Sequence, residues 1–180
     1  MASDVITLPG GRRLRWYEFG DRGGPPVLYT TGTPVSGLDG AWYDQAARAS
    51  GLRWISLDKP GYGGSGYHRD RSLASWADDL AALAGHLGLD RFALAGESGG
   101  APFTLEIALI RPPWPFPLGE VTTPVHLWHG TRDTNAPIAN SRHLARELPD
   151  ATLHTSDSAD HEIGRDRSEE ITSVIASCVT

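Results

Sequence analysis

The sequence has little of several features that mark large protein classes. It contains one cysteine, Cys178, so no disulfide framework can form within the chain. Lys and Arg together number 16 against 22 Asp and Glu, and the resulting net charge of -6 disfavours nucleic acid, whose binding depends on clustered basic side chains. No apolar stretch approaches the roughly 20 residues that span a bilayer. Residues 1–5 show no signal-peptide pattern, so we expect a cytoplasmic protein without nucleic-acid or membrane partners.

The length and composition favour one α/β domain over residues 1–180. A chain of 180 residues can bury a full hydrophobic core without disulfide or metal staples. The 21 glycines and 13 prolines suit a chain that turns often between strands and helices. The proline-rich segment 111–124 cannot form a regular helix or a central strand, and is expected to be a connection.

Hydrophobic periodicity supplies the predicted elements. Runs at 5–8 and 13–19 flank a Pro-Gly-Gly turn and predict an antiparallel hairpin. Further short apolar runs predict strands at 26–30, 52–57, 92–95, 125–128 and 151–155. Helical spacing predicts helices at 73–87, 99–110, 138–148 and 171–178, the first with Ser72 as N-cap and Gly88 as its end. The alternation predicts a mostly parallel, doubly wound sheet with an N-terminal antiparallel hairpin and helices on both faces.

Cys178 falls on the apolar stripe of the last predicted helix, with Ile171, Val174 and Ile175. This position predicts a small buried side chain rather than a reactive thiol.

A Gly-Glu-Ser-Gly-Gly sequence at 96–100 directly follows a predicted strand and opens a predicted helix. A nucleophilic serine at the end of a strand needs a sharp, strained turn, and the flanking glycines allow close approach of neighbouring chains. Backbone N–H groups at the start of the following helix, beginning with Gly99, can stabilise a developing oxyanion. Ser98 is therefore a candidate nucleophile, although a glycine-rich turn that happens to contain serine has the same pattern.

Two further candidates follow later strands. Asp133 comes after the strand at 125–128, and His161 comes after the strand at 151–155. The chain order serine, acid, histidine differs from the orders in chymotrypsin and subtilisin. Because parallel strands collect their sites at their carboxyl ends, Ser98, Asp133 and His161 are expected to lie at one edge of the sheet.

Together these motifs resemble the α/β-hydrolase superfamily, near its proline-iminopeptidase-like and epoxide-hydrolase-like branch. The matching segments are Gly-x-Pro at 32–34, Asp-x-Pro-Gly-x-Gly at 58–63, the serine turn at 96–100 and His-Gly-x-x-Asp-x-x-x-Pro at 129–137. The resemblance implies that Ser98 is the nucleophile, His161 the general base and Asp133 the carboxylate that orients it. It also implies an oxyanion hole formed by the backbone N–H groups of Thr33 and Gly99.

Serine in the nucleophile position disfavours the family members that use aspartate there, the haloalkane dehalogenases and epoxide hydrolases. The resemblance thus implies hydrolysis of a small ester, thioester, lactone or amide through an acyl-enzyme, without cofactor or metal. No zinc-ligand spacing accompanies the acidic residues around His161.

The chain departs from the family pattern at three places. Thr31-Gly32 replaces the usual His-Gly at the oxyanion loop, so the hydrogen bonds that support this loop must differ. Ala159-Asp160 precedes His161 where the family usually has glycine. Only residues 99–132 separate Ser98 from Asp133, which leaves no room for the usual cap and for one central strand.

The shortening leaves alternatives open. A misaligned triad would make the chain a weak or inactive scaffold, such as a deletion product or a binding protein. A structural or interaction module is a third class. The aromatic residues Trp114 and Phe116, with Leu118, are expected to form a small lid, a homodimer patch or the packing of a connecting loop.

Overall fold

The computed structural model describes residues 2–98 and 117–179 and divides the chain into two compact units. Unit 1 is Met1–Arg111 with Ser168–Thr180, and unit 2 is Pro112–Arg167. The predicted helix at 99–110, the donor Gly99 and the aromatic residues Trp114 and Phe116 lie outside the described residues. The expectations of one domain, of a homodimer patch and of a missing central strand therefore stay predictions.

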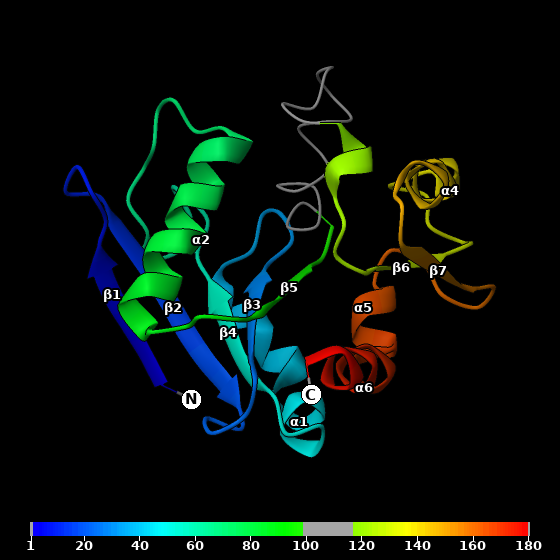
Figure 1. Cartoon of the computed structure of the whole chain (residues 1–180), viewed down its shortest axis with the longest axis horizontal. Coiled ribbons are helices and arrows are strands. Elements are labelled where there is room, and N and C mark those ends of the chain that lie inside the picture. The colour runs from blue at the N-terminus through cyan, green and yellow to red at the C-terminus, as the bar shows by residue number, and fades with distance from the viewer. Residues whose placement is uncertain (1, 99–116, 180) are drawn as a thin grey trace. The chain divides into compact units, whose positions relative to one another are not determined.

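Unit 1 is built on a five-stranded sheet with the strand order β1-β2-β4-β3-β5 (Figure 1). The strands are β1 (Ala2–Thr7), β2 (Arg13–Gly20), β3 (Pro26–Thr30), β4 (Arg53–Leu57) and β5 (Ala93–Gly96). β2 pairs antiparallel with β1 and β4, whereas β3 pairs parallel with β4 and β5. The predicted hairpin is confirmed, with Ile6 opposite Leu14 and positive φ angles at Gly10 and Gly11 in its turn.

One face of this sheet packs against the helix α2 (Leu73–Leu87). Buried Trp76 and Leu83 of α2 share a core with strand residues such as Leu28. The helix begins and ends as predicted: the Ser72 side chain accepts a hydrogen bond from the Ser75 N–H, and Gly88 adopts the left-handed conformation.

The buried face of α2 differs from the sequence prediction at two positions. The apolar spacing of residues 73, 76, 77, 80, 83, 84 and 87 predicts one buried face that includes Ala77. In the structure Ala77 is exposed, whereas Asp79 is buried. The guanidinium of Arg12 donates to the Asp79 carboxylate at 2.5 Å. This ion pair allows a carboxylate to occupy a position that helical spacing alone would give to an apolar residue.

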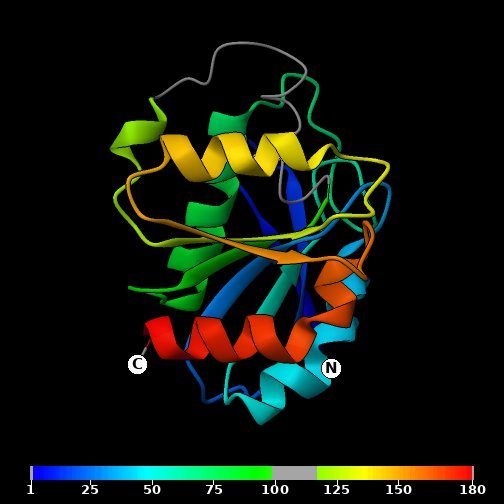
Figure 2. The same ribbon diagram turned by 90° about the vertical axis from the view of Figure 1, so that its right-hand side faces the viewer.

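The opposite face is covered by η1 (Gly37–Tyr43), α1 (Asp44–Ala49) and α6 (Ser168–Val179), and Figure 2 shows α1 beside α6. Tyr43 stacks on Trp54 in this second core, with ring centroids 4.7 Å apart, and Tyr29 packs against both rings at a tilt. The helices η1 and α1 were not predicted, because their short span carries no repeated apolar stripe.

The prediction for Cys178 is wrong, because its side chain is exposed. The buried stripe of α6 runs through Ile171, Ile175 and Val179, with Ala176 also packed against the core. Val179, one turn beyond Ile175, takes the place that the sequence pattern gave to Cys178.

Unit 2 contains a second, two-stranded sheet, in which β6 (Val125–Gly130) pairs parallel with β7 (Ala151–Ser156). Its helices are η2 (Leu118–Glu120), α4 (Ile138–Glu147) and α5 (Ile163–Asp166). The helix α4 packs on the two strands, and Figure 2 shows it running alongside them.

These elements confirm the predicted fold class, a mixed α/β chain with an N-terminal antiparallel hairpin, parallel strands and helices on both faces of the larger sheet. Within the described residues, no helix has the length and apolar character needed to cross a bilayer.

Candidate active site

Ser98 lies two residues beyond the end of β5 and is half-buried. Its φ is +48°, and within the described ranges it is the one non-glycine residue with positive φ. A side chain with a Cβ in this region costs of order 1–3 kcal/mol, and such strain persists where the surrounding structure enforces it. The predicted serine turn therefore has, at the end of its strand, the strained left-handed serine that a nucleophile elbow requires.

Glu97, which precedes Ser98, accepts hydrogen bonds from two tyrosines. The hydroxyl groups of Tyr29 and Tyr43 donate to its Oε2 at 2.9 and 3.0 Å. Burial is the main cause that raises the pKa of both tyrosines, and the neighbouring Glu97 carboxylate raises them further. Both phenols thus stay protonated donors, and Glu97 serves as an anchor of the strained turn.

The predicted oxyanion donor Thr33 lies in the loop that follows β3. This loop runs beside the serine, because a Cβ built on Gly32 would lie 3.9 Å from Ser98 Oγ. The structure thus brings the Thr33 loop to the serine turn within unit 1. The second predicted donor, Gly99, lies outside the described residues.

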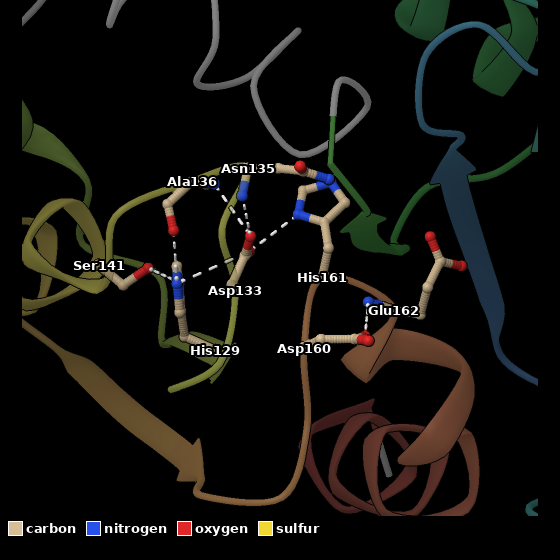
Figure 3. Close-up of polar contacts among 8 residues, drawn as sticks. All are labelled: His129, Asp133, Asn135, Ala136, Ser141, Asp160, His161 and Glu162. Carbon is tan, nitrogen blue, oxygen red and sulfur yellow. Dashed lines mark hydrogen bonds and ion pairs between the residues drawn. The ribbon is translucent and has the colours of Figure 1, made fainter.

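Asp133 and His161 meet in unit 2, as Figure 3 shows. The Nδ1 of His161 donates to Asp133 Oδ2 at 2.8 Å. The other oxygen, Oδ1, accepts hydrogen bonds from the backbone N–H groups of Asn135 and Ala136 at 2.7 and 2.9 Å. Because the carboxylate fixes the proton on Nδ1, a neutral imidazole keeps its lone pair on Nε2, where a general base needs it.

The pKa of Asp133 reflects two opposing effects. Burial raises it, but the hydrogen bonds from Ala136, His161 and Asn135 outweigh burial and hold the pKa below its usual value. The carboxylate therefore stays ionised at neutral pH and can stabilise a positive charge on His161.

This lowered pKa predicts an acid-dependent loss of stability. Asp133 stabilises the fold above its unfolded pKa of about 3.9, and this contribution disappears as pH falls through the lower folded value. We expect the difference in unfolding free energy between the wild type and Asp133→Asn to shrink as pH is lowered below about 4. Urea denaturation from pH 3 to 7 measures it, with exposed Asp150→Asn as the matched control. A difference that is constant over this range would contradict the prediction.

His129 supports the Asp133 turn and was not assigned this role from sequence. Its Nε2 lies 3.1 Å from the Ala136 carbonyl oxygen, and its Nδ1 lies 2.8 Å from Ser141 Oγ (Figure 3). A carbonyl can only accept, so Nε2 carries the proton and donates it. The same Nε2 lies 3.8 Å from Asp133 Oδ2. His129 thereby ties the turn 133–137 to α4.

Gly130 explains why glycine follows His129 in the sequence motif. A Cβ at this position would overlap the backbone oxygens of Ala159 and Asp160. The absence of a side chain lets the loop that carries His161 pass directly against the end of β6.

Asp160, which replaces the family's glycine, does not crowd the imidazole. Its Oδ1 accepts a hydrogen bond from the Glu162 backbone N–H at 2.9 Å, and Figure 3 shows the carboxylate turned away from the ring. The departure from the family pattern at this position is accommodated by a local turn.

Ser98 belongs to unit 1, whereas Asp133 and His161 belong to unit 2. Within unit 1, Ser98 lies beside the loop that carries Thr33, and within unit 2, Asp133 is hydrogen-bonded to His161. The complete three-residue arrangement, and the catalytic role of each member, stay predictions.

Solved structures of other proteins show which fold this is. The esterase EaEST from Exiguobacterium antarcticum aligns with a TM-score of 0.79 and 15% identity, over 97% of this chain and 98% of that one. The α/β hydrolase domain-containing protein 10 from mouse aligns with a TM-score of 0.72 and 16% identity, over 98% and 97%. At such identities the likeness establishes the fold alone: this chain has the α/β-hydrolase fold.

Sequence comparison gives a shorter match. No protein-family model matches the chain. Over 104 residues it is 36% identical to the dihydrolipoyllysine-residue acetyltransferase component of the acetoin cleaving system of Pseudomonas putida. The match covers 57% of this chain, which spans 28% of the length of that relative.

Proposed function

We propose that this chain is a serine hydrolase that cleaves small ester, thioester, lactone or amide substrates through an acyl-enzyme. Ser98 is the nucleophile, His161 the general base and Asp133 the carboxylate that orients and stabilises the histidine. We also propose that the chain lies near the proline-iminopeptidase-like and epoxide-hydrolase-like branch of the superfamily. This part of the proposal rests on the loop motifs, because the structural likeness shows the fold alone.

In this proposal His161 Nε2 accepts the Ser98 hydroxyl proton as Oγ bonds to the acyl carbon. The N–H groups of Thr33 and Gly99 hold the negative charge on the carbonyl oxygen. His161 then passes its proton to the leaving group as the bond to that group breaks. Water, deprotonated by His161, releases the acid product and regenerates Ser98.

The observation that carries the proposal is the left-handed backbone of Ser98 at the end of β5. Ordinary glycine-rich turns place glycine, not serine, in that conformation, because the Cβ makes it costly. Strain of this kind is characteristic of functional sites. The preformed hydrogen bond between Asp133 and His161 supports the same assignment.

A fluorophosphonate probe on the purified protein tests the proposal, because such probes phosphonylate activated serines. We expect labelling of the wild type at Ser98 by mass spectrometry and no labelling of Ser98→Ala. The matched control is Ser50→Ala, which removes another half-buried hydroxyl, one that binds Thr172 and takes no part in the candidate site, and is expected to label normally.

The opposite outcome selects the alternative. A wild type that is folded by circular dichroism and shows no labelling is an inactive scaffold with the α/β-hydrolase fold, and the hydrolase proposal is then wrong. Where the wild type labels, fresh protein that has not met the probe is assayed against p-nitrophenyl acetate, a thioester and a lactone of equal acyl length, and the relative rates rank the substrate classes.

A further inference from the structure

Lys59 is the only lysine in the chain, since every other basic residue counted with it is arginine. It follows β4 and Asp58 directly, and its exposed fraction is 0%. An ammonium group is costly to bury unless its N–H donors are satisfied. The sequence therefore places its single lysine where it must bind specific partners.

Partners of Lys59 include three consecutive residues of the loop after β3. Lys59 Nζ donates to the carbonyl oxygen of Thr31 at 2.8 Å, to that of Gly32 at 2.6 Å and to Thr33 Oγ1 at 2.7 Å. An ammonium has three N–H donors, and all three of these acceptors lie within hydrogen-bond reach of it. The ring of Tyr62 lies 5.0 Å from Nζ and adds a cation–π contact.

The contact to Gly32 fixes the direction of the next amide. The C=O and N–H of one trans peptide group point in opposite directions because the group is planar. In the described part of the chain, the cis peptide bond is at Thr33-Pro34, so the Gly32-Thr33 bond is trans. With the Gly32 oxygen bound to Lys59, the Thr33 N–H must point away from the lysine.

The loop that Lys59 holds also borders the nucleophile. A Cβ built on Gly32 would lie 3.4 Å from Ser98 Cβ and 3.9 Å from Ser98 Oγ. All of these residues belong to unit 1. A change in the orientation of the Gly32-Thr33 peptide would therefore occur within reach of the reacting oxygen.

We propose that Lys59 is a positioning residue for the oxyanion hole: it binds the Gly32 carbonyl and thereby turns the Thr33 N–H toward the substrate oxygen. This inference rests on the proposed hydrolase function. It also accounts for the Thr31-Gly32 sequence, since the lysine supplies the support that this loop needs. Lys59 acts through the peptide group and does not itself touch the substrate.

Lys59→Met tests the role, because methionine keeps an unbranched apolar side chain and removes all three donors. We expect kcat for p-nitrophenyl acetate to fall about 100-fold, the scale of losing one oxyanion donor, with KM changed little. The rate of fluorophosphonate labelling at Ser98 should fall with kcat. A variant that folds and labels at the wild-type rate would show that Lys59 has no positioning role.

Chemical rescue separates positioning from packing. In a Cys178→Ser background, Lys59→Cys is unfolded and alkylated with bromoethylamine, which restores an ammonium at nearly the original length. The matched control is alkylated with iodoethane, which restores bulk without charge, and both are refolded identically. We expect the aminoethyl protein to recover at least about a tenth of the wild-type kcat, the ammonium group being worth most of the 100-fold loss, and the ethyl protein to stay low.

The outcomes distinguish the two proposals. If the ethyl protein recovers as well as the aminoethyl protein, Lys59 only fills space and the inference is wrong, while the hydrolase function stands. If the wild type itself does not label, the hydrolase function fails and the role of Lys59 fails with it. The alkylated pair also keeps the test valid if Lys59→Met does not fold.

Discussion

His161→Ala is expected to lower kcat for p-nitrophenyl acetate by about a millionfold, and Asp133→Asn by about ten thousandfold. The first change removes the proposed general base. The second keeps the shape of the side chain but replaces the carboxylate that holds the proton on Nδ1, so the imidazole can present the wrong tautomer to Ser98. Because the proposal has Asp133 act in catalysis only through His161, the double variant should be no slower than His161→Ala.

Two exposed residues of unit 2 provide matched controls for this cycle. His143→Ala and Asp150→Asn make the same chemical changes elsewhere, and both are expected to leave kcat within about twofold of the wild type. If the effects of His161→Ala and Asp133→Asn multiply in the double variant, the two residues act independently. The hydrogen bond of 2.8 Å between them would then have no catalytic role.

Asp58→Ala is expected to lower the free energy of unfolding by at least about 3 kcal/mol, because it leaves several buried donors without acceptors. Asp58 is fully buried. Its Oδ1 accepts from Gly37 N–H at 2.6 Å, and its Oδ2 accepts from Gly64 N–H at 2.7 Å and from the Tyr17 hydroxyl at 3.3 Å. The Asp58 carboxylate thus joins three segments of the chain, those of Tyr17, Gly37 and Gly64, next to Lys59.

Urea denaturation of Asp58→Ala measures this loss, with Asp4→Ala as the control. Asp4 is exposed on β1 and accepts a hydrogen bond from the adjacent Val5 N–H, so its removal should cost no more than about 0.5 kcal/mol. A loss below about 1 kcal/mol for Asp58→Ala would mean that water or neighbouring groups satisfy the three donors.

The strands were predictable because each is a short apolar run closed by turn residues. All seven predicted strands are present within the described residues. Long helices such as α2 were predictable from their spacing and caps, whereas η1 and α1 were not, because they owe their form to packing on the sheet. The buried ion pair of Arg12 with Asp79 was also hidden, since its members are far apart in sequence.

In the candidate site, the sequence predicted the candidate catalytic residues better than the residues that hold them in place. The serine turn and the positions of Asp133 and His161 after β6 and β7 follow from residue order and strand ends. The anchors Glu97, His129 and Lys59 were missed as supporting groups, because their partners come from other segments. The one available signal was compositional: a lone lysine next to a buried strand in a chain otherwise rich in arginine.

The complete burial of Lys59 makes the folded chain unreactive at lysine toward acylating reagents. A reagent specific for the ε-amino group reaches it only when the loop after β3 and the segment after β4 separate. When the loop closes faster than it is labelled, the rate of acylation at Lys59, divided by the rate for an exposed lysine, therefore reports the fraction of molecules in which this loop has opened. The loop that this single lysine reports on borders the proposed nucleophile.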